Sequence, residues 1–244
     1  MNLTIDIGNT RAKTGVFKDG QLLRTDIWEQ WTFADFLAYA ANHSAQNIIL
    51  STVAGSFSAE ERQELQRRFT YVELQADTLL PIENRYRSPN TLGKDRIAAV
   101  VGAHYLYAGQ ACLVVDAGTC ITYDFLDQHG CYVGGNIAPG LRMRLRAMHA
   151  FTAGLPQEEV EETVDWIGDT TATALRNGAQ TGALLELEGY QRWGNSRFGP
   201  LQALLTGGDA DFLANRAKSK IFVHHHLVLI GLNQILDYNV KRLE

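Results

Sequence analysis

The feature that most constrains this chain is a strand–turn–strand motif that occurs twice. Residues 3–17 read LTIDIGNTRAKTGVF, and residues 113–125 read LVVDAGTCITYDF. Each copy runs from an apolar, β-prone segment into Asp-x-Gly, then Thr, then a second β-prone segment. A glycine at such a turn lets the backbone approach a ligand, the turn amides can bind phosphate oxygens, and the carboxylate can hold a cation. The two copies therefore predict a two-part site for phosphate and metal.

Either copy alone is explained equally well as an ordinary β-hairpin in which Asp and Gly serve the turn. The matched pair favours the site, and in a chain of 244 residues it also favours two domains, at residues 1–110 and 111–244. Strands alternate with helices in both halves. This pattern predicts an α/β fold in which each half is a mixed sheet flanked by helices, with a ligand cleft between the domains.

Composition excludes several classes of protein. The net charge is -5, the pI is about 5.8, and the Lys and Arg residues are dispersed, which is not typical of a nucleic-acid-binding protein. No run reaches the roughly 18 to 20 apolar residues of a membrane span, and the first residues enter a strand without a signal-peptide pattern. We therefore expect a cytoplasmic protein that does not bind membranes.

Cysteines and histidines give no metal signature. The three cysteines, Cys112, Cys120 and Cys131, form no C-x-x-C pair, so we expect free thiols in a reducing compartment. Cys120 lies inside the second motif, where a small buried side chain is favoured over a reactive thiol. Three adjacent histidines at 224–226 cannot easily face one ion, so a polar loop is the better interpretation.

The remaining pattern predicts the order of the elements. After a tight turn at 18–20, apolar periodicity and capping residues indicate helices and short strands in alternation. The expected helices are 32–43, 58–69 with Ser58 as N-cap, 96–107, 142–150, 170–193, 209–217 and 228–240. The expected strands outside the first motif are 47–53, 71–74, 112–125 as a hairpin, 130–138, 202–206 and 221–223.

The paired turns resemble those of the acetate and sugar kinase, Hsp70 and actin superfamily, in which two ribonuclease-H-like domains hold ATP between them. Further blocks narrow the resemblance to the type III pantothenate kinases and cover nearly the whole chain, whereas DIGNT alone would not be specific. In order, the blocks are DIGNTRAK (6–13), YRSPNTLGKDR (86–96), DAGTCITYD (116–124), GGNIAPGL (134–141), GDTTATALRNG (168–178), TGGDA (206–210) and LVLIGL (227–232).

The resemblance implies transfer of the γ-phosphoryl group of ATP to the primary hydroxyl of pantothenate, the first step of coenzyme A synthesis. Such chemistry needs positioning, charge neutralisation and a base for the attacking hydroxyl. Asp116 is the family's position for a monovalent cation, potassium or ammonium. Magnesium accompanies the nucleotide, with Asp6 as a candidate contact. The residues implied to line ATP are Asp6, Ile7, Gly8, Asn9, Thr10, Arg11, Ala12, Lys13 and Thr119, although Lys13 could equally be a solvated lysine on a strand.

The resemblance makes Asp95 the catalytic base, whereas the segment alone would favour an N-cap aspartate at the start of a helix. Arg96 suits the carboxylate of pantothenate because a guanidinium can form two parallel hydrogen bonds with it, and a salt-bridged surface arginine is the alternative. The full set of implied substrate contacts is Tyr86, Gly93, Lys94, Asp95, Arg96 and Thr171.

Thr171 begins the pattern Thr-x-x-Ala-x-x-x-Gly, in which Ala174 and Gly178 would let a helix pack closely on another backbone. Helix packing alone explains that pattern, so the role of Thr171 as a ligand contact depends mainly on the family. In related enzymes parts of the pantothenate pocket come from a second subunit, which implies a homodimer. The glycines of TGGDA fit a backbone near adenine or ribose, or a strand-to-helix turn.

Two other functions remain open at this stage. One is a kinase of the same superfamily that acts on another small hydroxy acid or sugar. The other is an accessory or regulatory protein without turnover, since proteins of this family have also been named as accessory factors for a regulator of virulence genes. An intact Asp95 beside two Asp-x-Gly turns counts against the second alternative, because a protein freed from catalysis has no need of a base there.

Overall fold

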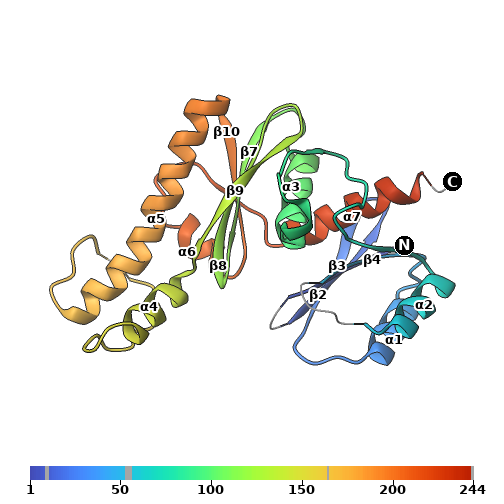
Figure 1. Ribbon diagram of the computed structural model, residues 1–244, viewed down its shortest axis with the longest axis horizontal. Coiled ribbons are helices and arrows are strands. Elements are labelled where there is room, and N and C mark those ends of the chain that lie inside the picture. Colours follow the sequence, from blue (N-terminus) through green and yellow to red (C-terminus); the bar gives the residue numbers. More distant parts are fainter. Residues whose placement is uncertain (9–10, 53–56, 164, 243–244) are drawn as a thin grey trace. The chain divides into compact units, whose positions relative to one another are not determined.

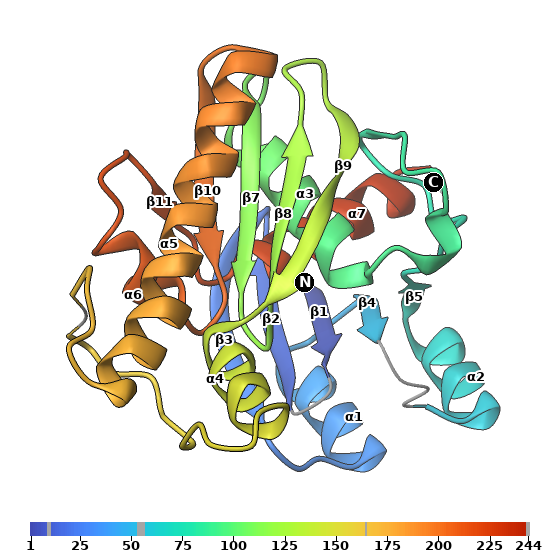
Figure 2. The same cartoon turned by 60° about the vertical axis from the view of Figure 1, so that its left-hand side comes forward.

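The computed structural model describes residues 1–8, 11–52, 57–163 and 165–242, so the predicted ATP contacts Asn9 and Thr10 lie outside the described residues. The chain forms two compact units (Figures 1 and 2). Residues 1–108 and 226–244 make the first unit, and residues 109–225 make the second.

The first unit is built on a five-stranded mixed sheet with the strand order β3-β2-β1-β4-β5. Its strands are β1 (Asn2–Ile7), β2 (Ala12–Lys18), β3 (Gln21–Trp28), β4 (Asn47–Thr52) and β5 (Thr70–Glu73). The first three strands pair antiparallel, and β1, β4 and β5 pair parallel. The predicted turn at 18–20 is confirmed, with φ of 50° at Asp19 and 79° at Gly20.

Helices cover both faces of this sheet (Figure 1). Alternation along β1 sends Ile5 and Ile7 into the core beneath α1 (Phe33–Asn42) and α2 (Ala59–Arg68). Both helices begin as expected, with capping boxes at Thr32 and Ser58. The opposite face carries α3 (Lys94–Leu106) and α7 (Leu227–Val240). A two-residue strand β6 (Glu83–Asn84) and a 3₁₀ turn η1 (Pro89–Thr91) precede α3.

The last helix, α7, belongs to the first unit, although the predicted second domain of residues 111–244 included it. The Nδ2 atom of Asn2 in β1 donates to Oδ1 of Asn233 in α7 at 2.9 Å. A pairing between residues this far apart along the chain leaves no local sequence signal. Sequence order alone therefore places this helix in the second domain, which is the nearer one along the chain.

The second unit repeats the topology of the first. Its strands run in the order β11-β10-β7-β8-β9, in which β7, β8 and β9 are antiparallel neighbours and β10 pairs parallel with β7 and β11. Read from the far edge, this is the same order as β3-β2-β1-β4-β5. The strands are β7 (Ala111–Ala117), β8 (Cys120–Leu126), β9 (Cys131–Pro139), β10 (Leu201–Thr206) and β11 (Phe222–Val223). The prediction of an α/β fold with two mixed sheets flanked by helices is confirmed.

Three helices flank this second sheet, and Figure 2 shows α5 (Thr171–Phe198) running along it. On β8, Tyr123 and Phe125 point toward α5, where Tyr123 packs on Tyr190 with ring centroids 4.3 Å apart. The other helices are α4 (Leu141–Ala150) and α6 (Ala210–Ala214). Helix α5 runs past the expected end at Trp193, and α6 is shorter than expected.

Within the described ranges, no helix combines the length and apolar character that crossing a membrane requires.

Candidate active site

Three polar side chains occupy neighbouring positions on adjacent strands of the first sheet, where the first Asp-x-Gly turn begins. Asp6 of β1 lies opposite Lys13 of β2 and beside Ser51 of β4. The Oγ atom of Ser51 donates a hydrogen bond to Oδ1 of Asp6 at 3.0 Å. Strand register therefore joins the two ends of the predicted block 6–13 and adds a serine that motif reasoning missed, since only the β1–β4 pairing reveals it.

The electrostatics of Asp6 connect this row to Asp95. Burial raises the pKa of Asp6 to about 6, and the negative charge of Asp95 adds to the rise. The Ser51 hydrogen bond and the positive charge of Lys13 act in the opposite direction. Lys13 is half-buried and acts on Asp6, so it is not merely a solvated lysine. The carboxylate of the first Asp-x-Gly turn and the predicted base thus lie in one unit of the protein, close enough to interact.

Asp95 lies in the first turn of α3, whose N-cap is Gly93. The alternative that Asp95 is itself the N-cap is therefore wrong. Its Oδ1 atom accepts a hydrogen bond from the backbone N of Arg96 at 2.9 Å, and it would lie 2.5 Å from any Cβ added to Gly93. A side chain at position 93 would displace the carboxylate, which explains why glycine starts this helix.

Arg96 is buried, with 5% of its surface exposed, so the alternative of a surface arginine is also wrong. Its guanidinium carbon lies 5.6 Å from the centroid of the Tyr86 ring. The backbone N of Tyr86 donates to Oδ1 of Asn84, which orders the segment before the 3₁₀ turn. The structure thus brings together Tyr86, Asp95 and Arg96, while Lys94 beside them is half-exposed.

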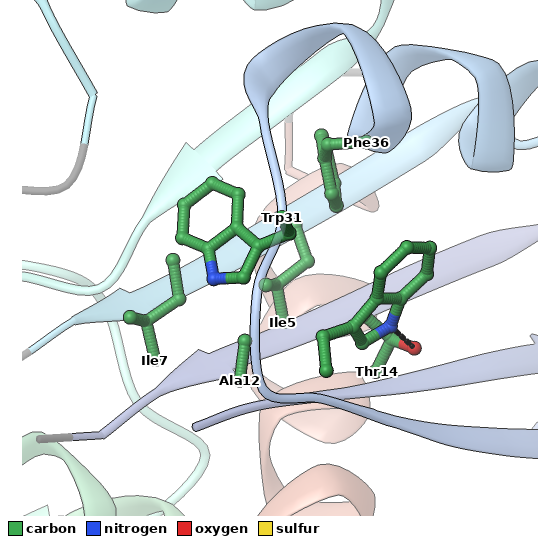
Figure 3. Close-up of a pocket in the computed structure, with 7 residues that line it drawn as sticks. Ile5, Ile7, Ala12, Thr14, Trp31 and Phe36 are labelled. Atoms are coloured by element: carbon green, nitrogen blue, oxygen red, sulfur yellow. Dashed lines mark hydrogen bonds between the residues drawn. The ribbon is translucent and has the colours of Figure 1, made fainter. Parts of the chain in front are cut away.

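The turn of the first motif closes through a hydrogen bond from Gly8 N to Arg11 O at 3.1 Å. Gly8 and Arg11 are exposed at this turn. The side chains of Ile7 and Ala12 line a small apolar pocket with Trp31 on the sheet face away from Asp6 (Figure 3). Ile7 and Ala12 therefore have only backbone atoms to offer a nucleotide.

The second motif is held by two other turns of its own unit. A Cβ added to Gly207, where φ is +92°, would lie 2.5 Å from Oδ1 of Asp116. The backbone N of Asp209 donates to Ala117 O at 2.9 Å, and that of Gly140 donates to Thr119 O at 3.1 Å. Motifs far apart in sequence, TGGDA and GGNIAPGL, thus fix the turn that carries the half-buried Asp116 and the exposed Thr119.

An ion pair links the start of α4 to the TGGDA turn. Nη1 of Arg142, in the first turn of α4, lies 3.0 Å from Oδ1 of Asp209, whose side chain is only 9% exposed. The arginine itself is 57% exposed. Sequence reasoning did not single out this pair, because its partners are separated by the whole of α5.

Thr171 begins α5 in the second unit and is exposed, directly after the N-cap Thr170. Predicted close packing at Gly178 is wrong within this chain, because a Cβ there would meet no described atom within 4 Å. Instead Gly168 packs on the backbone of Ala174, which a Cβ on Gly168 would approach to 2.2 Å. The structure does not group Thr171 with Asp95 in one compact unit.

The cysteine and histidine predictions have mixed outcomes. No disulfide joins Cys112, Cys120 or Cys131, and Cys120 is half-exposed at the start of β8, so the prediction of a buried side chain is wrong. The histidines at 224–226 lie in a loop and turn before α7, as expected. Among the described side chains, no cluster of three or more His, Cys, Asp or Glu residues is arranged to hold a metal.

The chain is similar to known proteins along nearly its whole length. A Phocaeicola vulgatus protein named type III pantothenate kinase is 41% identical over 242 residues, which is 99% of this chain and 100% of the relative. A Campylobacter jejuni structure named for the Baf family of transcriptional activators superposes with a TM-score of 0.62 at 24% identity, covering 98% of this chain and 99% of that one. A ROK hexokinase from Thermus thermophilus superposes with a TM-score of 0.55 at 15% identity, with coverages of 98% and 99%.

The two structural likenesses show the fold, which this chain shares with both of these structures. The family model described as type III pantothenate kinase matches residues 2–192, from β1 well into α5. This range includes both Asp-x-Gly turns and the Gly-x-Asp-Arg helix start. The chain therefore belongs to the type III pantothenate kinase family.

Proposed function

We propose that this protein transfers the γ-phosphoryl group of ATP to the primary hydroxyl of pantothenate, giving ADP and 4′-phosphopantothenate at the start of coenzyme A synthesis. The observation that carries the proposal is the interaction of Asp95 with Asp6, since it pairs a base for the acceptor with the carboxylate of a phosphate-binding turn. Full-length similarity to a curated type III pantothenate kinase supports the same substrate.

The first turn binds the ATP phosphates. Gly8 and Arg11 are exposed there for contacts with phosphate oxygens, and Lys13 adds positive charge beside them. Oxygen ligands suit magnesium, and the half-buried Asp6 carboxylate fits such an ion together with phosphate oxygens. Bound magnesium would neutralise charge on the phosphates. Asn9 and Thr10 are further ATP contacts by family resemblance.

Asp95 acts as the general base. Its carboxylate takes the proton from the pantothenate hydroxyl as the hydroxyl oxygen forms a bond to the γ-phosphorus of ATP. The bond between that phosphorus and the bridging oxygen breaks, and ADP leaves with the electron pair. Lys13 and the turn amides offset the negative charge that this transfer concentrates on the phosphates.

Arg96 holds the carboxylate of pantothenate. A buried guanidinium can form two parallel hydrogen bonds with a carboxylate, and the nearby ring of Tyr86 restricts its orientation. Gly93, Lys94 and Thr171 complete the substrate contacts by family resemblance. This assignment predicts that acceptors without a carboxylate bind poorly.

The second turn serves the nucleotide and a monovalent cation. Asp116 is half-buried beside the tightly packed Gly207 turn, which holds its carboxylate in a fixed setting for potassium or ammonium. Thr119, exposed at the tip of the turn, contacts ATP. Asp116 and Asp6 occupy corresponding strands of two sheets with one topology. In this proposal the second copy holds the cation and the first binds the phosphates.

The working enzyme is a homodimer in the cytoplasm. The open surface at Gly178 and the exposed Thr171 support a second subunit along the start of α5, where small residues permit close approach. Three cysteines that form no disulfide suit a reducing compartment.

A coupled assay of ADP release over a panel of acceptors tests the proposed function. With ATP, magnesium and potassium, pantothenate should give a signal well above sugars and other hydroxy acids, and mass spectrometry should identify phosphopantothenate. A stronger signal with another acceptor would support a kinase of different specificity. No turnover with any acceptor would favour the accessory-protein alternative.

A further inference from the structure

The C-terminal helix α7 carries no residue assigned above to nucleotide or substrate, yet it contacts two elements that do. It packs on β1, which holds Asp6, and along α3, which holds Asp95. Figure 1 shows α3 and α7 side by side. Helix α3 contacts α7 extensively and contacts β4 of the sheet much less. The position of α3 in this unit therefore depends mainly on α7.

The two helices meet backbone to backbone. A Cβ added to Gly231 of α7 would lie 1.7 Å from the carbonyl oxygen of Ala98 in α3. A Cβ added to Gly102 of α3 would lie 2.4 Å from the carbonyl oxygen of Leu227 in α7. Contacting residues are spaced four apart on both helices, as in ridges-into-grooves packing. Because the obstacles are backbone atoms, no change of rotamer can accommodate a methyl group, and α3 would have to move.

The other side of α7 is fixed to the sheet by partly buried hydrogen bonds. Nδ2 of Asn2 donates to Oδ1 of Asn233 at 2.9 Å and to Oδ1 of Asp237 at 2.6 Å. Asn47 of β4 donates to Oδ1 of Asn2 at 2.9 Å, and Asn233 is fully buried. Sliding of α7 on β1 would leave these polar groups without partners, which is costly in a buried setting.

We infer that Gly231 is a positioning residue for phosphoryl transfer, which sets the separation of Asp95 from Asp6 by letting α3 seat closely on α7. This inference rests on the proposed function, in which Asp95 is the base. Helix α7 acts as a spacer between β1 and α3, fixed to the strand by Asn233 and to the helix by Gly231. A misplacement of about 1 Å at a reacting group can cost about 100-fold in rate.

Gly231→Ala tests the inference, with Gly189→Ala as the matched control. The control makes the same chemical change in helix α5, where the added Cβ meets no described atom within 4 Å. In folded Gly231→Ala, kcat with pantothenate should fall by about 100-fold, and the KM for ATP should stay within about two-fold of wild type because the β1–β2 turn is undisturbed. The control should keep both constants.

Hydrogen exchange supplies a second measurement that needs no substrate. Peptides covering residues 93–99 should exchange faster in Gly231→Ala than in wild type or in the control. A folded Gly231→Ala protein with unchanged kcat would overturn the inference, and so would unchanged exchange. Parallel losses of kcat and ATP affinity would also overturn it, since they would indicate general damage.

If Gly231→Ala does not fold, Asn2→Ala tests the same spacer from the strand side. Loss of its hydrogen bonds to Asn233 and Asp237 should lower kcat by about 3-fold to 10-fold, with the KM for ATP unchanged. An unchanged kcat in this variant would overturn the inference. If the wild-type protein shows no pantothenate-dependent turnover, the proposed function is wrong. Hydrogen exchange does not depend on turnover, so it still tests whether Gly231 positions α3 on α7.

Discussion

The hydroxyl of Ser51 lies 3.0 Å from Oδ1 of Asp6 and is the donor that counteracts the burial of this carboxylate. Ser51 is 1% exposed, so no bulk water replaces the hydrogen bond when the hydroxyl is removed. The hydrogen bond joins β4 to the end of β1, where the first Asp-x-Gly turn begins. It makes Ser51 a determinant of the charge on Asp6 near neutral pH.

Ser51→Ala should therefore raise the pKa of Asp6 further and move the acidic limb of the pH–rate profile to higher pH. Activity at pH 7 should fall by about 10-fold, in line with the loss of a hydrogen bond to a charged group, and should recover partly at pH 8.5. Ser196→Ala, which changes an exposed serine in α5, is the control. An unshifted limb in Ser51→Ala would show that the hydrogen bond does not influence Asp6.

Asp6 makes the unliganded protein less stable as pH rises. Because its folded pKa of about 6 exceeds the ordinary value of 3.8, the folded state binds more protons between these values. The unfolding free energy should therefore fall by on the order of 3 kcal/mol between pH 3.8 and pH 6. This loss of stability is complete above pH 6 and absent below pH 3.8.

Asp6→Asn should remove that contribution and be the more stable protein at pH 7.5, although it loses activity. Urea unfolding at pH 4 and pH 7.5 measures the difference, with the exposed Asp77→Asn as control. Equal pH dependence in wild type and Asp6→Asn would contradict the prediction.

Asp95→Asn should lower kcat by about 10²-fold to 10⁴-fold, since the amide cannot accept the proton of the acceptor hydroxyl. Its size matches the carboxylate, so the unfolding midpoint and the KM for ATP should stay close to wild type. Steady-state kinetics and a thermal melt check both parts. Retention of more than a tenth of wild-type kcat would remove Asp95 from the role of base.

Arg96→Lys should raise the KM for pantothenate by about 10-fold to 100-fold, because an ammonium cannot form the two parallel hydrogen bonds of a guanidinium. The KM for ATP should not change. The exposed Arg87→Lys, one residue after Tyr86, makes the same substitution as a control. If both variants raise the KM for pantothenate equally, the carboxylate is bound by charge in general and not by Arg96.

Replacement of potassium by a large organic cation should abolish most activity if Asp116 holds a monovalent cation. Asp116→Asn should have low activity that no longer responds to potassium concentration. Titration of potassium chloride at constant ionic strength measures this response in both proteins. Full activity of the wild type without potassium or ammonium would contradict the cation role of Asp116.

Local patterns predicted much of this fold. The helix starts near Thr32 and Ser58, with Ser58 as N-cap, the tight turn at Asp19-Gly20 and both hairpins follow from spacing along the chain, and each is confirmed. Local sequence could not show that α7 returns to the first sheet. That placement depends on Asn2 and Asn233, and on a backbone contact at Gly231 that looks like any other helical glycine in the sequence.

In the candidate site, too, the sequence motifs predicted which residues matter but not how the fold surrounds them. Motif resemblance supplied Asp6, Asp95 and Arg96, but not the setting of each. The parallel register of β1 and β4 brings Ser51 to Asp6, and burial turns Arg96 from a surface residue into one held over Tyr86. Both depend on tertiary packing, which no short segment encodes.

The return of α7 to the first unit also affects how the protein is made. Residues 109–225 form the second unit from one uninterrupted stretch, whereas the first needs residues 226–244 as well. A chain that emerges from the ribosome N-terminus first can complete its second unit while the first still lacks a helix. The apolar residues of α3 that face α7 are then open to water, or to a chaperone, until residues 226–244 have been released.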